Sequence, residues 1–171
     1  HPDYQNMIAE EEKGGHTVAI HSASHKYNQI YTSEQAFFDD LEQMNSIIKA
    51  QTGNDASIIR FPGGSSNTVS KDYCPGIMTQ LVNDVTARGL LYCDWNVSSG
   101  DANSKPISTE QVVQNVISGV QSHNVSVVLQ HDIKDFSVNA VEQIIQWGQA
   151  NGYTFLPLTT SSPMSHHRVN N

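Results

Sequence analysis

Apolar residues recur at two periods along this chain, and segments with the two periods alternate. Five short runs are rich in apolar residues and have the length of a strand; they lie at 16–21, 57–61, 90–97, 125–131 and 153–158. Five longer segments are rich in helix formers or repeat their apolar residues every three or four positions; they lie at 3–13, 33–53, 75–89, 108–124 and 137–152. The first pattern predicts strands, and the second predicts helices.

The segment 33–53 shows the helical pattern most fully. Ser33 is a good N-cap, because its hydroxyl oxygen can accept a hydrogen bond from a backbone N–H of the first turn. Gly53 is a typical stop signal. Between them, four apolar residues recur at helical spacing: Phe37, Leu41, Met44 and Ile48. One face of this helix is therefore expected to be buried.

Strands that alternate with helices of this length indicate right-handed crossovers and a parallel sheet, either open or closed into a barrel. We therefore expect an α/β fold. The chain opens on a helix, as if its first strands were missing. A chain of 171 residues can bury one sizeable core, so we expect residues 1–158 to form one domain, followed by an unpacked polar tail at 159–171.

Composition argues against nucleic acid and against a membrane span. The net charge is −8 with only nine Lys and Arg, whereas phosphate binding needs a basic footprint. Apolar runs such as 125–129 fall far short of the ~20 residues that a bilayer crossing needs. Cys74 and Cys93 form no CxxC motif and indicate neither a thiolate zinc site nor a disulfide framework. Because the first residue is His, we expect any export signal to lie upstream.

Polar residues follow several of the predicted strands at their carboxyl ends, where parallel α/β folds bind their ligands. His21 ends one strand and His25 comes four residues later, while Arg60 ends the next strand. Asp101 follows the strand 90–97, and His131 closes the strand 125–131. We expect these side chains to open onto one face of the protein.

Each of these residues also has a purely structural interpretation. An H-x-x-x-H pair is a weak signal, and two loop histidines held by hydrogen bonds would give the same pattern. Arg60 could pair with Asp101, and His131 could be a buried histidine that closes a strand. Together, however, the residues form a coherent set for metal-assisted hydrolysis, because two imidazoles suit zinc and a third histidine can protonate a leaving group.

The sequence around these residues resembles the polysaccharide deacetylases, the carbohydrate esterases of family four that carry the NodB homology domain. "GGHTVAIHSASH" resembles the family's second motif, whose two histidines bind the metal, here His21 and His25. "RFPGG" resembles the third motif, which is normally Arg, two prolines, an aromatic residue and Gly. Three residues fit this third motif and two depart from it: Arg60, Pro62 and Gly64 fit, whereas Phe61 and Gly63 differ.

Two later stretches extend the resemblance over nearly the whole chain. "WNVSSGDA" resembles the fourth motif, an aspartate followed by tryptophan; Asp101 fits, and Ala102 does not. "VVLQHD" resembles the fifth motif, Leu-x-His, with Leu129 and His131 in place. The resemblance implies a distorted (β/α) barrel of the NodB type that lacks its first strands.

The resemblance also assigns roles to individual residues. His131 would be the general acid for the leaving amine, and Asp101 would orient it. Leu129 would line the pocket for the acetyl methyl group, and Pro62 would also bind the substrate. The backbone N–H of Gly63 would help to hold the developing oxyanion, a role that needs no side chain. Arg60 would tune the general base.

That base is missing from the sequence. The family's first motif is a strand that ends in two adjacent aspartates, which supply the base and the third metal ligand. Asp39 and Asp40 are adjacent, but they lie inside the predicted helix 33–53, where we expect them to face solvent. The resemblance therefore implies the larger, C-terminal part of a deacetylase domain, with little or no turnover. It also implies open sheet edges, which favour a dimer or strand exchange.

Three interpretations follow. The first is a deacetylase of an extracellular or cell-surface polysaccharide, such as peptidoglycan or chitin-type oligomers, with zinc as the expected metal and cobalt, manganese or nickel as alternatives. The second is an inactive carbohydrate-binding or structural module on the same scaffold. The third is an unrelated metal hydrolase whose ligands happen to be similar.

Overall fold

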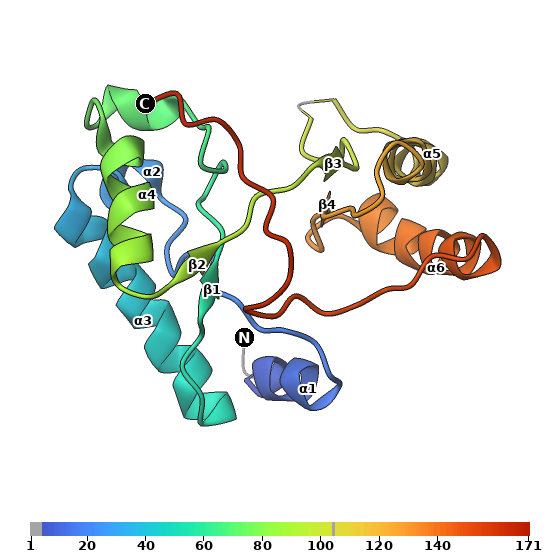
Figure 1. Ribbon diagram of the computed structural model, residues 1–171, viewed down its shortest axis with the longest axis horizontal. Coiled ribbons are helices and arrows are strands. Elements are labelled where there is room, and N and C mark those ends of the chain that lie inside the picture. Colours follow the sequence, from blue (N-terminus) through green and yellow to red (C-terminus); the bar gives the residue numbers. More distant parts are fainter. Residues whose placement is uncertain (1–4, 104) are drawn as a thin grey trace. The chain divides into compact units, whose positions relative to one another are not determined.

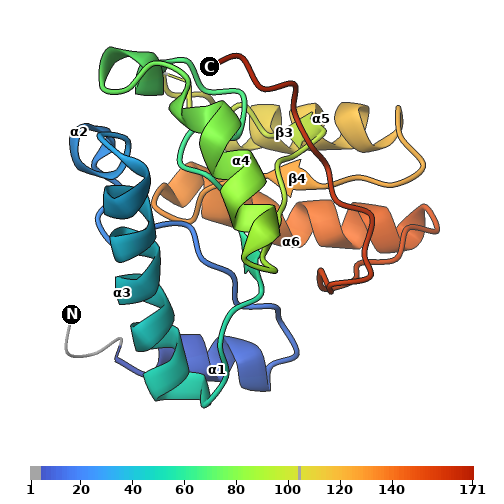
Figure 2. The ribbon, with the colours of Figure 1, turned by 60° about the vertical axis from the view of Figure 1, so that its left-hand side comes forward.

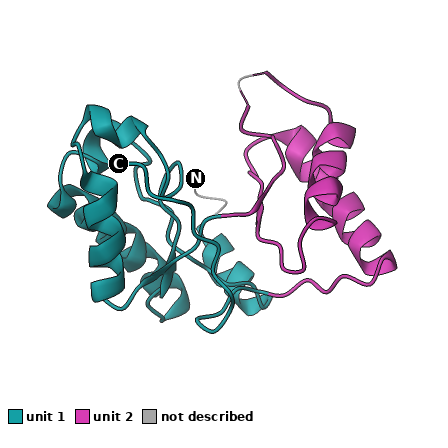
Figure 3. Ribbon diagram, turned by 45° about the horizontal axis from the view of Figure 1, so that its top comes forward, with its two compact units in different colours: residues 1–94, 157–171 teal, residues 95–156 magenta. Residues whose placement is uncertain are grey.

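The computed structural model describes residues 5–103 and 105–171, and its backbone contacts divide the chain into two compact units. Within the described residues, unit 1 holds the chain up to Asp94 together with 157–171, and unit 2 holds 95–156 (Figure 3). Each unit has its own pair of short parallel strands and its own helices (Figure 1).

The sheet of unit 1 places the ends of three chain segments next to one another. β1 (Ile58–Ile59) pairs in parallel with β2 (Leu91–Tyr92), and Ile20 forms a single parallel bridge to Ile59 on the other side of β1. The backbone N–H of Arg60 donates to the carbonyl of Ile20 at 2.9 Å, which fixes the register of that bridge. The residues that follow Ile20 and β1 therefore leave the sheet at the same edge.

Helices cover this sheet in unit 1. α3 (Glu34–Thr52) begins as expected, because the Ser33 hydroxyl accepts from the backbone N–H of Ala36, and it ends at the left-handed Gly53. α4 (Ile77–Ala87) packs against β2 and lies beside α3 (Figure 2). α1 (Met7–Lys13) packs on α3, while residues 3 and 4 of the helix expected there lie outside the described residues.

Two short helices of unit 1 were not predicted. They are α2 (Tyr27–Ile30) and the 3-10 helix η2 (Val69–Asp72). Both are four residues long, too short to show a helical period. The core of this unit is an aromatic and aliphatic cluster that includes Ile20, Tyr31, Phe37, Leu41, Ile59, Phe61, Met78, Leu81 and Val85.

Unit 2 packs two helices against one strand pair. β3 (Val97–Ser98) pairs in parallel with β4 (Val128–Leu129), and α5 (Thr109–Val120) and α6 (Asp135–Ala150) pack together. Gly119 lets α5 approach β3 closely, since a Cβ at this position would collide with the side chain of Val97. The core of unit 2 comprises Val112, Val113, Val116, Ala140 and Ile144.

Three of the five predicted strands differ in the structure. The segment 16–21 is reduced to the bridge at Ile20, and 90–97 contains β2 and the first residue of β3, which belong to different sheets. The segment 153–158 forms no strand. Its Phe155 lies so close to Gly148 that a Cβ there would approach the ring to 2.6 Å, so this aromatic residue packs on the end of α6 instead of entering a sheet.

The expectation that residues 159–171 would be unpacked is wrong. The buried carboxylate of Asp94 accepts from the backbone N–H of His167 at 2.9 Å, and the ring of His166 stacks on Tyr92 with centroids 4.0 Å apart. The Asn171 carbonyl accepts from the backbone N–H of Thr79 at 2.8 Å. The polar segment 159–171 is held largely by hydrogen bonds of its backbone, which side-chain composition cannot predict.

Both Cys74 and Cys93 are free thiols. Among the helices of the described residues, none has both the length and the apolar character to cross a membrane.

Candidate active site

His21 follows the Ile20 bridge and lies beside Arg60, which follows β1. The His21 Nδ1 is 2.8 Å from the backbone carbonyl of Arg60. A carbonyl can only accept, so Nδ1 carries the proton in this contact, and in the neutral ring Nε2 is then the nitrogen with the lone pair. Metal-binding histidines are typically oriented in this way, with the other ring nitrogen donating to a carbonyl or carboxylate.

His25 is brought next to His21 by a tight turn. The two ring centroids are 5.0 Å apart with the planes tilted by 57°. His25 has φ of 53°, a left-handed conformation that is uncommon for a residue with a side chain. Its backbone N–H donates to the hydroxyl of Ser22 at 2.8 Å, which closes the turn.

Asp40 of α3 holds this turn from outside. Its carboxylate accepts from the Ser22 hydroxyl at 2.5 Å and from the backbone N–H groups of Ala23 and Ser24, both at 2.9 Å. Partial burial by itself would raise the pKa of Asp40, but these hydrogen bonds outweigh it and the pKa lies below its ordinary value. The expectation that Asp40 faces solvent is therefore wrong, whereas Asp39 is exposed and accepts from Gln35.

The loop after Arg60 is fixed by two tyrosines. The hydroxyl of the buried Tyr31 donates to the carbonyl of Pro62 at 2.7 Å. Gly63 has φ of 78°, and a Cβ on it would lie 2.6 Å from the Tyr27 hydroxyl oxygen. The Arg60 side chain is half-buried, and this burial lowers the pKa of its guanidinium, an effect that Cys93 and Asp94 partly oppose.

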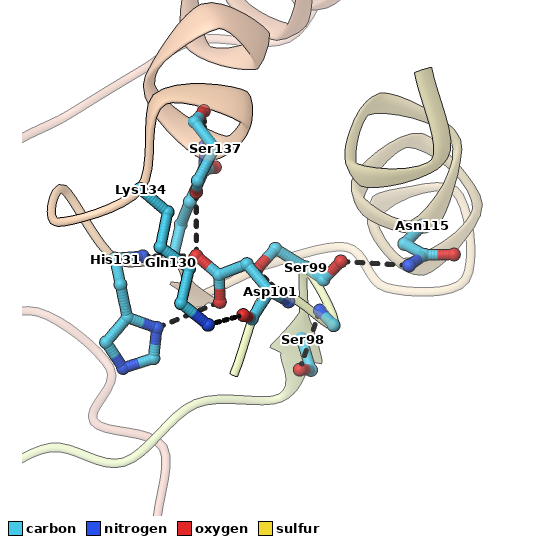
Figure 4. A network of polar contacts seen from close by, with 9 residues as sticks. Ser98, Ser99, Asp101, Asn115, Gln130, His131, Lys134 and Ser137 are labelled. Atoms are coloured by element: carbon cyan, nitrogen blue, oxygen red, sulfur yellow. Dashed lines mark hydrogen bonds and ion pairs between the residues drawn. The ribbon is translucent and has the colours of Figure 1, made fainter. Parts of the chain in front are cut away.

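Unit 2 holds a second polar cluster around Asp101 (Figure 4). The carboxylate of Asp101 accepts from the backbone N–H of His131 at 2.6 Å, from His131 Nδ1 at 2.8 Å and from the Ser137 hydroxyl at 2.7 Å. The Lys134 ammonium donates to the backbone carbonyl of Asp101. Burial by itself would raise the pKa of Asp101, but the hydrogen bonds from Ser137, His131 and Ser99 together lower it to about 2.

Leu129 is linked to this cluster by a backbone hydrogen bond. It is buried at the end of β4, and its carbonyl accepts from the backbone N–H of Ser99 at 3.0 Å. The structure thus brings His21, His25 and the Arg60 loop together in unit 1. It brings Asp101, Leu129 and His131 together in unit 2.

Neither the His21–His25 pair nor the Asp101–His131 pair supplies a complete set of metal ligands among the described residues. In residues 5–103 and 105–171, no three His, Cys, Asp or Glu side chains are grouped closely enough to hold an ion. His21 and His25 nevertheless fit two positions of a zinc site, because both are imidazoles, their rings are adjacent and the tautomer of His21 is set by a carbonyl.

Asp40 and Ser137 were missed as members of these clusters, although the sequence carries a signal for Asp40. It lies three residues after Phe37 and four before Met44, which places it on the apolar stripe of the helix. A carboxylate on a buried stripe needs partners. Ser137 likewise begins the buried stripe of α6, which continues through Ala140 and Ile144.

Comparison with known proteins gives the class of this chain. Residues 2–74 match the sequence model of the polysaccharide deacetylase family, and this range contains His21, His25 and the Arg60 loop. A curated peptidoglycan-N-acetylglucosamine deacetylase from Bacillus cereus is 27% identical over 157 residues, which are 90% of this chain and 54% of that protein. The chain thus spans about half the length of this curated relative.

Solved structures agree with this assignment. The catalytic domain of a peptidoglycan N-acetylglucosamine deacetylase from Eubacterium rectale is 98% identical, with a TM-score of 0.98 over all of this chain and 78% of that one. A carbohydrate esterase of family four from Streptococcus mutans is 25% identical, with a TM-score of 0.72 over 90% of this chain and 69% of that one. This chain belongs to the polysaccharide deacetylase family, and the expected α/β fold of the distorted NodB barrel type is confirmed.

Proposed function

We propose that this chain carries most of the machinery of a metal-dependent deacetylase that hydrolyses acetyl groups from an N-acetylated polysaccharide. The observation that carries the proposal is the His21–His25 pair, with rings 5.0 Å apart and His21 Nδ1 bound to the Arg60 carbonyl. Peptidoglycan is the proposed substrate, because two of the relatives are named for deacetylating its N-acetylglucosamine. Chitin-type oligomers and O-acetylated polymers would meet the same chemistry.

His21 and His25 are the proposed protein ligands of the metal. Zinc suits two imidazoles best, and cobalt, manganese and nickel suit them as well. If held there, such an ion would supply Lewis-acid chemistry, polarising the acetyl carbonyl and lowering the pKa of a water molecule. Arg60, with its half-buried guanidinium, is the proposed residue that tunes the base.

His131 is the proposed general acid. Hydrolysis adds water to the acetyl carbon and breaks its bond to nitrogen, and the leaving amine must gain a proton. Asp101 holds His131 Nδ1 at 2.8 Å, so Nε2 is the atom that would deliver this proton. Gly63 would donate its backbone N–H to the carbonyl oxygen, beside Pro62, and Leu129 would contact the acetyl methyl group.

We further propose that this chain by itself turns over slowly or not at all. Its one Asp-Asp pair is Asp39–Asp40. Asp40 is engaged by the His21–His25 turn and Asp39 by Gln35, so neither is placed as a strand-end base. This observation also supports the second candidate function, a carbohydrate-binding module on the deacetylase scaffold.

The remaining proposals concern partners and location. A cell-wall polysaccharide substrate favours an extracellular or cell-surface location. The acidic net charge of −8 argues against a nucleic-acid partner. A dimer or strand exchange through the edges of the short parallel sheets stays a prediction.

The test compares two proteins on N-acetylglucosamine oligomers and on peptidoglycan, with added zinc or cobalt. One is this chain, and the other is extended upstream through a strand that ends in Asp-Asp. We expect released acetate only from the extended protein, and expect His131→Ala to abolish it while His123→Ala, at an exposed helix end, leaves it unchanged. Equal activity of the two proteins would overturn the proposed impairment. Oligosaccharide binding by both without acetate release would support the binding module.

A further inference from the structure

We propose that Asp40 is a positioning residue that sets the geometry of the His21–His25 pair from α3. This inference rests on the proposed role of the two histidines as metal ligands. Asp40 touches neither ring. It acts on the three residues between them, because its carboxylate accepts from Ser22, Ala23 and Ser24.

The three hydrogen bonds use both oxygens of the carboxylate. Oδ2 accepts from the Ser22 hydroxyl at 2.5 Å and from the Ala23 N–H at 2.9 Å, while Oδ1 accepts from the Ser24 N–H at 2.9 Å. Hydrogen bonds to a charged acceptor are stronger than those between neutral groups. The whole segment between the two histidines is therefore held by one side chain.

A relay carries this anchoring to His25 itself. The His25 N–H donates to the Ser22 hydroxyl oxygen at 2.8 Å, and the same hydroxyl donates its proton to Asp40. His25 has φ of 53°, a conformation that costs free energy and persists only where its surroundings hold it. The relay supplies such a hold, since it fixes the backbone nitrogen of the strained residue.

Asp40 lies on α3, a long helix that is capped at both ends. Asp40 follows the buried Phe37 and Phe38 in α3 and precedes the buried Leu41. α3 has nineteen residues with an intact N-cap at Ser33 and a left-handed stop at Gly53. A carboxylate on this helix therefore ties an otherwise irregular turn to the core of unit 1.

Only a carboxylate meets the geometry. An asparagine at this position keeps the shape but has a single acceptor oxygen, and its NH2 group would face an N–H or a hydroxyl donor. Asp40→Asn thus removes the charge and one acceptor oxygen of the anchor without opening a cavity. Asp39→Asn is the matched control, because Asp39 is the adjacent residue of the same helix, carries the same charge and is exposed.

The experiment measures the zinc affinity of this chain by competition with a chelator, and the hydrogen exchange of the Ala23 and Ser24 amides. His21→Ala identifies the zinc that belongs to this site. Asp40→Asn should weaken that zinc binding by about 10-fold, the lower end of the range for a lost partner of a metal ligand, because Asp40 holds the backbone between the two histidines and neither ring. It should also speed exchange at both amides. Asp39→Asn should change the affinity by less than about twofold.

Ser22→Ala provides a milder second variant, for the case that Asp40→Asn does not fold. It breaks the relay to His25 but keeps the two backbone bonds of Asp40, so the affinity should fall by less than in Asp40→Asn and the Ser24 amide should stay protected. Far-UV circular dichroism before zinc addition confirms that each variant is folded.

The outcomes separate this inference from the proposed function. If the wild-type chain binds no zinc that depends on His21, the proposed metal site fails, and the amides then decide the role of Asp40. Faster exchange of the Ala23 and Ser24 amides in Asp40→Asn, but not in Asp39→Asn, supports the role of Asp40 as an anchor. Unchanged exchange in Asp40→Asn overturns it. If the wild type binds zinc and Asp40→Asn binds it equally well, the inference is wrong while the proposed function stands.

Discussion

Asp101 and His131 are joined by two hydrogen bonds to one carboxylate, from the His131 backbone N–H at 2.6 Å and from its ring Nδ1 at 2.8 Å. The backbone hydrogen bond fixes the position of the His131 main chain, and the ring hydrogen bond fixes the orientation of its imidazole. Asp101 is 2% exposed, so the pair is shielded from water on the carboxylate side. The geometry suits a histidine that must present Nε2 in one orientation and one tautomer.

Replacing this carboxylate should slow the reaction without weakening substrate binding. In the chain extended upstream, Asp101→Asn is expected to lower kcat for acetate release by about 10²-fold or more, because it would disturb His131, the proposed general acid. KM should change little, since Asp101 lies behind His131 and would not touch the sugar. Steady-state kinetics on N-acetylglucosamine oligomers measure both values. A large rise in KM with an unchanged kcat would contradict the role assigned to His131.

Asp101 should also make unit 2 sensitive to acid. Hydrogen bonds lower its pKa to about 2 from an ordinary value of 3.8. The carboxylate therefore stabilises the fold in full above its ordinary pKa, and this contribution is lost as the pH falls through the folded value. The shift corresponds to roughly 2 kcal/mol of unfolding free energy, which we expect to disappear between about pH 5 and pH 2.

Tryptophan fluorescence can follow this loss selectively, because both tryptophans, Trp95 and Trp147, lie in unit 2. Urea unfolding at a series of pH values should show wild type more stable than Asp101→Asn at pH 6, with the gap closing towards pH 2. A gap that stays constant over this range would mean that the carboxylate charge contributes nothing to stability.

The sequence predicts helices better than strands in this protein. α3 was located to within one residue at each end, because Ser33 and Gly53 mark its limits by capping chemistry that is local. Strands depend on a partner far along the chain. The apolar run 90–97 contains β2 and the first residue of β3, which belong to different sheets, and Asp94 between them accepts hydrogen bonds from Ser65 and from the backbone of His167.

The candidate site follows the same division. The adjacency of His21 to His25 and of His131 to Asp101 could be predicted, the first from a four-residue spacing and the second from motif resemblance. The anchors behind them could not be assigned in the same way. Ser137 reaches Asp101 across 36 positions of sequence, and only the fold brings them together. The amphipathic pattern of the helix 33–53 predicts a solvent-facing Asp40, because the pattern does not show that the residues between His21 and His25 supply donors to this carboxylate.

Asp94 should hold the C-terminal segment in place. Its buried carboxylate accepts from the Ser65 N–H at 2.8 Å, the Ser65 hydroxyl at 2.5 Å and the His167 N–H at 2.9 Å. Asp94→Asn is expected to cost about 2–3 kcal/mol of unfolding free energy, because hydrogen bonds to a charged group are lost inside the protein. Trypsin should then cleave faster after Arg168, as seen by mass spectrometry.

Asp72→Asn provides the comparison for this variant, since Asp72 is exposed in η2. It should leave both the unfolding free energy and the cleavage rate unchanged within error. Rapid cleavage after Arg168 in the wild type would show that the segment is not held, whatever Asp94 contributes.

A side chain at Gly63 should destabilise the protein for two separable reasons. Its φ of 78° is strained for any residue with a Cβ, and that Cβ would lie 2.6 Å from the Tyr27 hydroxyl oxygen and 3.1 Å from Asn67 Cβ. Gly53 has a similar φ of 81° but nothing within 4 Å. Gly53→Ala therefore measures the backbone cost alone, about 1 kcal/mol.

Gly63→Ala should cost about 1–3 kcal/mol more than Gly53→Ala, because overpacking is added to the backbone strain. Tyr27→Phe removes the hydroxyl but leaves the ring between His25 and Tyr31, so it should recover part of this cost in the double variant Gly63→Ala/Tyr27→Phe. Urea unfolding followed by far-UV circular dichroism gives the unfolding free energies of the wild type, the three single variants and the double variant. Equal costs for Gly63→Ala and Gly53→Ala, or additivity in the double variant, would show that the Tyr27 hydroxyl does not collide with a Cβ at position 63.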